Sequence, residues 1–171
     1  MTTTDVRTSM VLVPFAVGAA VAVGLGVYGN VHAPQSAPML WFTSPLPAKV
    51  WLTTGAFALA LVQLLSALVI YGKVRGPGRF SAVHRWSGRV AVLLTVPVVV
   101  HCLYALGFDP SSPRVLAHSL LGCFFFGAFT AKMLLLTRRG VPGWALPLIG
   151  GGVFTGLVGL WLTSALWFFT D

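Results

Sequence analysis

Two histidines, His101 and His118, stand on either side of a short polar turn between two apolar segments. The turn runs from Gly107 to Pro113 and is rich in Pro and Ser, so the segments are expected to return antiparallel as neighbouring helices. His101 lies six residues before Gly107, and His118 lies five residues after Pro113. At a rise of about 1.5 Å per residue, both imidazoles are expected roughly 8–9 Å below the same membrane face. Two imidazoles at one depth on facing helices can bind an iron ion from both sides.

The ligand set favours haem iron over zinc. Zinc takes four ligands, and no Cys, Asp or Glu stands three or four residues from either histidine, one helical turn away. Haem iron with two axial histidines needs only this pair. A histidine inside an apolar span is costly and is a functional candidate by default, although a hydrogen bond to a neighbouring helix is the alternative for each ring. The sequence therefore predicts one haem b with His101 and His118 as the axial iron ligands.

Three further residues lie one turn from these histidines. Arg114 precedes His118 by four residues on the same helix face, where it can meet a haem propionate; the alternative is a snorkelling interfacial arginine. Gly122 follows His118 by four residues and leaves room for a flat porphyrin. Tyr104, three residues after His101, offers a hydroxyl to the second propionate. These residues complete the predicted cofactor-binding set.

Composition identifies an integral membrane protein. Hydrophobic residues make up 57% of the chain and charged residues 8%, about a third of the charged share in soluble domains. The formal net charge is +8. Because the basic residues cluster between apolar spans, membrane lipid headgroups are the expected partner and nucleic acid is not. The two cysteines form no CxxC pair, which argues against a cysteine zinc site or a disulfide scaffold.

Apolar runs of membrane length predict an all-α, five-helix transmembrane bundle in a single domain, residues 1–171. The expected helices cover about residues 10–30, 48–72, 82–107, 113–137 and 144–169. Pro97, one turn before His101, is expected to kink the third helix. Ser112 is expected to cap the fourth helix, with Pro113 as its first residue.

Small residues recur at helical spacing in two places. Gly18, Ala22 and Gly26 fall four residues apart in the first helix. Gly152 and Gly156 do so in the fifth. Such faces allow close helix contact, so the first is expected to pack tightly, and the second to form a packing contact or a homodimer contact.

Lysines and arginines predict the orientation in the membrane. Eight fall on the face that bears the N-terminus, and two, Lys49 and Arg114, on the other. The eight are Arg7, Lys73, Arg75, Arg79, Arg85, Arg89, Arg138 and Arg139. The positive-inside rule then puts the N-terminus in the cytoplasm and the C-terminus outside. The histidine pair is therefore expected in the outer half of the plasma membrane.

Two stretches share the pattern His-x-x-x-Gly at a helix start: His118-Ser-Leu-Leu-Gly122 and His84-Arg-Trp-Ser-Gly88. This pattern resembles the haem-ligand signature of the cytochrome b561 and ferric-reductase-like membrane cytochromes, over residues 82–137. The resemblance implies two haems, four helix histidines and electron transport across the membrane. The whole chain also resembles an uncharacterised five-helix actinobacterial membrane protein family. This sequence departs from the first pattern, because it has four histidines in all and His32 falls in a loop.

His84 is the residue on which motif and spacing disagree. It precedes His101 by 17 residues, which is about 25 Å along a helix, so it cannot reach the same iron. A second haem between His84 and Met133 is one possibility. The other is an interfacial histidine beside Arg85 and Arg89. Spacing favours one haem per chain.

The resulting prediction is a b-type cytochrome, an oxidoreductase or an electron-transfer subunit. Quinol or a second centre would donate electrons, and an extracytoplasmic electron carrier, metal ion or small oxidant would accept them, because a single haem near one face cannot bridge a core of about 30 Å. The alternative is a cofactor-free membrane anchor or scaffold of a larger complex. A transporter is disfavoured, since no acidic residue marks an ion path inside the spans.

Overall fold

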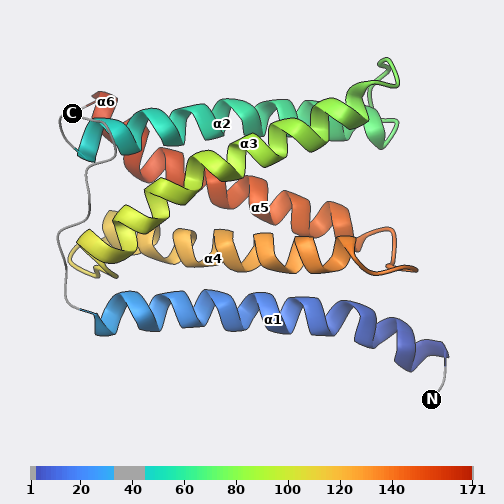
Figure 1. Cartoon of the computed structure of the whole chain (residues 1–171), viewed down its shortest axis with the longest axis horizontal. Coiled ribbons are helices and arrows are strands. Elements are labelled where there is room, and N and C mark those ends of the chain that lie inside the picture. The colour runs from blue at the N-terminus through green and yellow to red at the C-terminus, as the bar shows by residue number, and fades with distance from the viewer. Residues whose placement is uncertain (1–2, 33–44, 171) are drawn as a thin grey trace. The chain divides into compact units, whose positions relative to one another are not determined.

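The computed structural model describes residues 3–32 and 45–170, and this part of the chain consists of helices and turns without a strand. Figure 1 shows the α-helices. They are α1 (Thr3–Val31), α2 (Pro45–Ile70), α3 (Phe80–His101), α4 (Pro113–Leu136), α5 (Ala145–Trp161) and α6 (Trp167–Thr170). A π-helical stretch, Cys102–Leu106, extends α3, and a second one, Leu162–Leu166, joins α5 to α6.

Five helical stretches are long and apolar enough to cross a membrane, with mean hydropathies from 1.7 to 2.3. They are Met10–Val31, Pro47–Ile70, Phe80–Leu106, Pro113–Leu136 and Ala145–Thr170. The predicted all-α fold with five membrane-length helices is confirmed, and it indicates a multi-pass membrane protein. The orientation of the termini stays a prediction.

The largest difference from the expected boundaries is at the N-terminus. Helix α1 begins at Thr3, seven residues before the predicted start at Met10. Hydropathy marks the part of a helix that needs the bilayer, whereas the backbone of polar residues can continue the same helix into the headgroup layer. The apolar run therefore predicted the span correctly and the helix start too late.

The chain forms two compact units, and each is described by itself. The α1–α4 unit comprises residues 1–33 and 107–159. The α2–α3 unit comprises residues 34–106 and 160–171, so the boundary falls inside α5, after Gly159. The expected single transmembrane domain stays a prediction.

In the α1–α4 unit, α1 and α4 lie side by side through their glycines (Figure 1). A Cβ atom on Gly18 would lie 2.5 Å from the carbonyl oxygen of Gly127, and one on Gly127 would lie 2.8 Å from the Cβ of Ala22. A Cβ atom on Gly26, one turn after Ala22, would lie 3.7 Å from the sulfur of Cys123. The predicted close-contact face of the first helix is thus the face that packs against α4.

The first part of α5 packs on α4 within the same unit. Its small-residue face is filled by aromatic rings, because Cβ atoms on Gly152 and Gly156 would lie 3.4 and 3.3 Å from Phe124. A buried apolar cluster continues this contact and consists of Ala128, Ala131, Leu135, Ala145 and Ile149. Of the two predicted roles for the Gly152/Gly156 face, the structure shows packing within the chain.

In the α2–α3 unit, α3 lies against α2 near their connecting loop and diverges from it toward the end of α3 (Figure 1). The C-terminal residues of the chain pack on α2. The ring of Trp161 stacks on Phe57 with centroids 4.6 Å apart, and its indole N–H donates to the hydroxyl of Thr54 at 3.1 Å. This bond satisfies a polar ring nitrogen that the bilayer would otherwise leave unpaired.

The close approach of the α1 and α4 backbones at Gly18 predicts that one added methyl group destabilises the fold. Gly18→Ala should lower the free energy of unfolding in detergent by about 1–3 kcal/mol, because the new Cβ meets backbone atoms that cannot move aside. Gly24→Ala, in the same helix but with no atom within 4 Å of its Cβ, is the matched control and should be neutral or slightly stabilising. Equal stabilities of the two variants would contradict the described α1–α4 contact.

Candidate functional site

His101 lies where α3 changes its hydrogen-bond pattern. It is the last residue of the α-helix, it is half-buried, and the π-helical stretch Cys102–Leu106 follows directly. This irregularity begins about one turn after Pro97, the residue that the sequence analysis expects to disturb the helix. π-Helical turns are rare and occur frequently at functional sites. The sequence did not predict this one.

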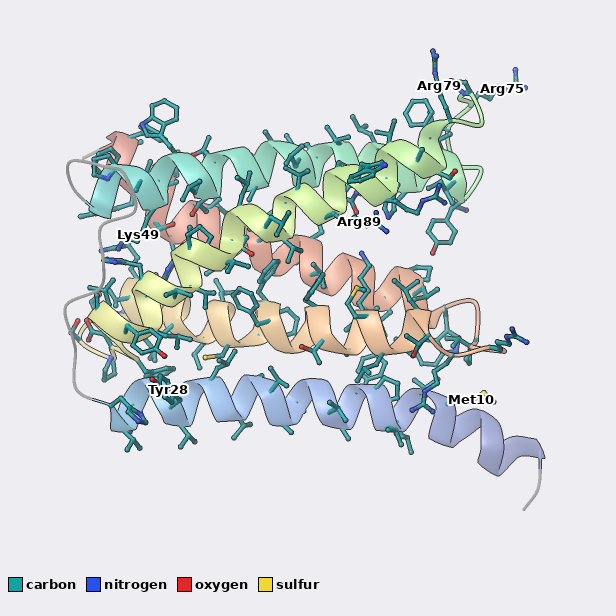
Figure 2. All side chains as sticks on the ribbon, viewed as in Figure 1. Met10, Tyr28, Lys49, Arg75, Arg79 and Arg89 are labelled. Atoms are coloured by element: carbon teal, nitrogen blue, oxygen red, sulfur yellow. The ribbon has the colours of Figure 1, made fainter. Side chains whose placement is uncertain are left out.

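A lysine that the sequence analysis left out of the site lies close to His101. Lys49, near the beginning of α2, acts electrostatically on both His101 and Cys102. Figure 2 shows it at the end of the α2–α3 unit opposite to Arg75 and Arg79. In the sequence, Lys49 is one of two cations expected on the outer face, and this position could have indicated a place in the site.

The π-helical turn also changes the position of Tyr104. Its side chain is 47% exposed. Because a π-helical turn holds more residues than an α-helical turn, Tyr104 lies farther around the helix from His101 than the regular spacing implies. Its expected role toward a propionate stays a prediction.

His118 lies in a regular helix with the predicted start. The Ser112 hydroxyl accepts a hydrogen bond from the Val115 amide at 3.3 Å, and Pro113 is the first helical residue. The predicted cap is confirmed. Since α4 is α-helical from there on, Arg114, His118 and Gly122 share one face at intervals of four residues, and all three are half-buried.

The turn that precedes α4 is fixed within the α1–α4 unit. Gly107 has φ of +70°, and the next amide, Phe108, donates to the carbonyl of Gly29 at 2.8 Å. The Asp109 amide donates to the hydroxyl of Ser119 at 3.4 Å. These bonds tie the turn to the end of α1 and to the first turns of α4, next to His118.

His32 follows α1 directly. Its Nδ1 lies 3.0 Å from the carbonyl oxygen of Tyr28, and the two rings stack with centroids 4.0 Å apart. The sequence predicts an exposed loop position for His32. The residue is exposed, and it caps the C-terminal end of α1.

The predicted site residues are distributed over both units. His84, His101 and Tyr104 belong to the α2–α3 unit, and Arg114, His118 and Gly122 belong to the α1–α4 unit. The pairing of His101 with His118 therefore stays a prediction. Within the described part of the chain, no group of three or more His, Cys, Asp or Glu can hold a metal ion. Each histidine thus offers one imidazole nitrogen to a metal. Haem iron takes one axial imidazole per side, so these residues fit haem iron better than a zinc site with four ligands.

His84 is part of a polar cluster between α2 and α3. Its Nδ1 lies 2.9 Å from the hydroxyl oxygen of Ser66, and that hydroxyl lies 2.7 Å from the carbonyl oxygen of Val62. A carbonyl only accepts, so the Ser66 proton is directed to Val62 and the Ser66 oxygen accepts from Nδ1–H of His84. For a neutral ring, this arrangement favours the tautomer with the proton on Nδ1.

Gln63 connects the same two helices. Its side-chain amide donates to the carbonyl of His84 and, at 2.7 Å, to the hydroxyl of Ser87. A Cβ atom on Gly88 would lie 3.0 Å from Oε1 of Gln63. In the His84-x-x-x-Gly88 motif, the glycine therefore makes room for a glutamine amide from the neighbouring helix.

Comparison with known proteins places the chain in one family. Residues 10–171 match the family of unknown function DUF6529. The chain belongs to DUF6529. No curated protein and no solved structure matches it. The family match covers all five membrane-length helices of this DUF6529 chain and extends beyond residues 82–137, on which the cytochrome b561 resemblance rests.

The expected interfacial position of His84 beside Arg85 and Arg89 stays a prediction, and the structure adds its contacts. In this DUF6529 chain the ring is half-buried and hydrogen-bonded to α2. The sequence did not predict the polar contacts of Gln63, Ser66 and Ser87 at this place. Gln63 could have indicated this cluster in the sequence, since it is the sole side-chain amide of α2. A polar side chain in a span needs a partner on a neighbouring helix.

The cluster predicts the tautomer of His84. In ¹⁵N NMR spectra of histidine-labelled protein, assigned through His84→Asn, neutral His84 should carry its proton on Nδ1, because the Ser66 oxygen accepts it. Ser66→Ala should remove this preference. Ser81→Ala, which changes an exposed serine at the start of α3, should leave it intact. A predominant Nε2–H form in the wild type would contradict the described hydrogen bond.

Proposed function

We propose that this protein is a membrane b-type cytochrome that carries electrons through haem b, with His101 and His118 as axial ligands in the outer half of the plasma membrane. The observation that carries the proposal is the position of both histidines beside one short connection. His101 precedes the end of the helical stretch at Leu106, His118 follows Pro113, and six residues separate these helices. Each imidazole thus lies within two turns of the same connection on consecutive membrane-length helices.

Local structure around each ring supports a ligand role. The transition from α- to π-helix at His101 is the kind of irregularity that marks functional sites in membrane and soluble helices. On α4, the cap at Ser112 and the bonds of the preceding turn hold the first two turns, and with them His118, in a defined place. A preorganised ligand loses less entropy on binding iron than a mobile one.

Charged residues next to each histidine suit the propionate groups of a haem. Arg114 lies one turn before His118, and Lys49 lies near His101. A guanidinium or ammonium group pairs with a carboxylate through charge-assisted hydrogen bonds. Each proposed ligand therefore has a cation near it in its own unit, which supports the proposal, and Gly122 leaves one turn of α4 without a side chain.

Haem b, when bound, supplies one-electron transfer by iron that cycles between two oxidation states. The protein's part is to hold the two imidazoles neutral and oriented, to keep water away by apolar helices and to balance the propionate charge. At about 9 Å of depth the site is near one face of a core of about 30 Å. Quinol in the membrane or a second centre is the expected donor, and an extracytoplasmic electron carrier is the expected acceptor. The resemblance of His118-x-x-x-Gly122 to the cytochrome b561 signature supports the same function.

A cofactor-free membrane anchor of a larger complex or homodimer is the second candidate. The observation that favours it concerns the other His-x-x-x-Gly motif. His84 and Gly88 both serve the contact between α2 and α3, through Ser66 and Gln63. Since the His84-x-x-x-Gly88 motif serves helix packing, the His118-x-x-x-Gly122 motif can serve helix packing as well.

Replacing either proposed ligand tests the cytochrome function. His101→Ala and His118→Ala should each abolish the low-spin haem spectrum of purified protein, because six-coordinate iron needs both rings. His32→Ala, which removes an exposed histidine outside the proposed site, should keep haem content and spectrum. If both ligand variants retain a full low-spin spectrum, the pairing is wrong; if the wild type is colourless after expression in haem-replete cells, the anchor function is favoured.

Arg114 should influence the midpoint potential. Reduction adds negative charge to the site, so removing a nearby positive charge disfavours the reduced state. Arg114→Gln should therefore lower the potential, by up to about 59 mV if the equilibrium changes tenfold, with both axial ligands retained. Arg138→Gln, which lies beyond the other end of α4, is the charge-matched control and should have no effect. An unchanged potential in Arg114→Gln would assign this residue to the lipid interface.

Cysteine labelling tests the proposed orientation. In a chain with Cys102 and Cys123 replaced by Ala, Ser111→Cys should react with an impermeant thiol reagent in intact cells, and Gly78→Cys should react only after lysis. Both positions are exposed, so access to the reagent depends on the side of the membrane. The opposite labelling pattern would move the site to the cytoplasmic half.

A further inference from the structure

In the α2–α3 unit, the loop after α2 and the first three turns of α3 carry much more positive than negative charge. What we name the basic face is the set of five exposed cations on this loop and on the first three turns of α3: Lys73, Arg75, Arg79, Arg85 and Arg89. The whole sequence has three carboxylate side chains, and none lies between Val6 and Phe108. In this unit the sequence contains one, Asp171, at the C-terminus. Five cations thus stand against one carboxylate side chain in the sequence of this unit, which favours an anionic partner for them.

The loop that carries the first cations has a defined conformation. Gly72 ends α2 with φ of +68°, and the amide of Lys73 donates to the carbonyl of Leu68 at 2.8 Å. Gly76 then folds back on the helix, since a Cβ there would lie 2.8 Å from a methyl group of Val69. This loop joins two membrane-length helices, and Figure 2 shows Arg75 and Arg79 extending from it away from the helices.

The remaining cations lie on α3, inside the stretch long enough to span the membrane. Arg89 is nine residues after Phe80, the first residue of that stretch, which is about 14 Å along the helix. Arg85 lies one turn before it. The guanidinium of Arg89 sits 5.1 Å from the ring centroid of Trp86, whose side chain is 62% exposed. An exposed Trp beside an Arg is typical of the level where headgroups meet acyl chains.

We propose that the basic face binds the phosphate of an anionic phospholipid. The loop cations attract the headgroup from the water side, Arg85 and Arg89 contact the phosphate from the membrane side, and Trp86 lies beside the glycerol and upper acyl chains. A lipid fits better than an acidic protein, because Arg89 and Trp86 lie within the apolar span, where a soluble partner does not reach. Clusters of four to eight Lys and Arg next to a membrane helix bind anionic lipids by the same electrostatics.

The test measures lipid affinity of the purified full-length chain in neutral detergent by native mass spectrometry. Phosphatidylglycerol should bind more tightly than phosphatidylcholine. The double variant Arg85→Gln/Arg89→Gln should weaken phosphatidylglycerol binding by about fivefold for each cation removed. Arg85→Lys/Arg89→Lys, which keeps the charge, should retain most of the preference and shows that the fold tolerates changes at these positions.

Two controls separate a site from general attraction. Arg138→Gln/Arg139→Gln removes the same charge from the exposed turn after α4 and should leave phosphatidylglycerol affinity unchanged. Inorganic phosphate at the same concentration should not displace the lipid, because it lacks the acyl chains that lie beside Trp86. Equal affinity for both lipids, equal weakening by both glutamine double variants, or displacement by inorganic phosphate would each overturn the proposal.

Discussion

The membrane core sets the constraint on which this structure depends: it offers no water to a polar group, so each polar side chain in a span needs a partner in the protein. The described residues obey it, since no buried side-chain nitrogen or oxygen among them lacks a hydrogen bond. Hydroxyl groups donate to backbone carbonyls of their own helix, as the Thr95 hydroxyl does to the carbonyl of Val92 at 2.7 Å. Larger polar groups reach a neighbouring helix, as Gln63 does to α3. The same constraint makes His101 and His118 informative, because an imidazole in a span needs either a protein partner or a metal.

Hydropathy predicted the spans well, because the bilayer acts on each segment separately. Most helix ends lie within three residues of the expected positions, and the Ser112 cap depends on local chemistry that the sequence contains. What the sequence could not supply depends on contacts between segments or on competition between hydrogen-bond patterns. The π-helical turn after His101 is an example, and it moves Tyr104 away from the face on which regular spacing places it. The electrostatic contact of Lys49 with His101 is another, because the two residues are 52 positions apart in the chain.

The two His-x-x-x-Gly motifs show why a short pattern underdetermines a site. In both, the residue one turn from the imidazole is a glycine and so adds no side chain in that space. At Gly88 that space is taken by the amide of Gln63, and the ring of His84 bonds to Ser66. What fills the space is decided by the neighbouring helix, which the motif does not contain. His84 lies about 25 Å from His101 along the helix, which agrees with a packing role. The prediction of one haem per chain therefore rests on His101 and His118.

Haem stoichiometry of the purified wild-type protein, measured as the pyridine haemochromogen against protein concentration, tests the central claim most directly. The cytochrome function with a single bis-histidine site predicts one haem b per chain, and His84→Ala should keep that value because its ring is engaged by Ser66. Two haems per chain, falling to one in His84→Ala, would show that the second motif also binds iron. A wild-type protein without haem, isolated from haem-replete cells, would contradict the account.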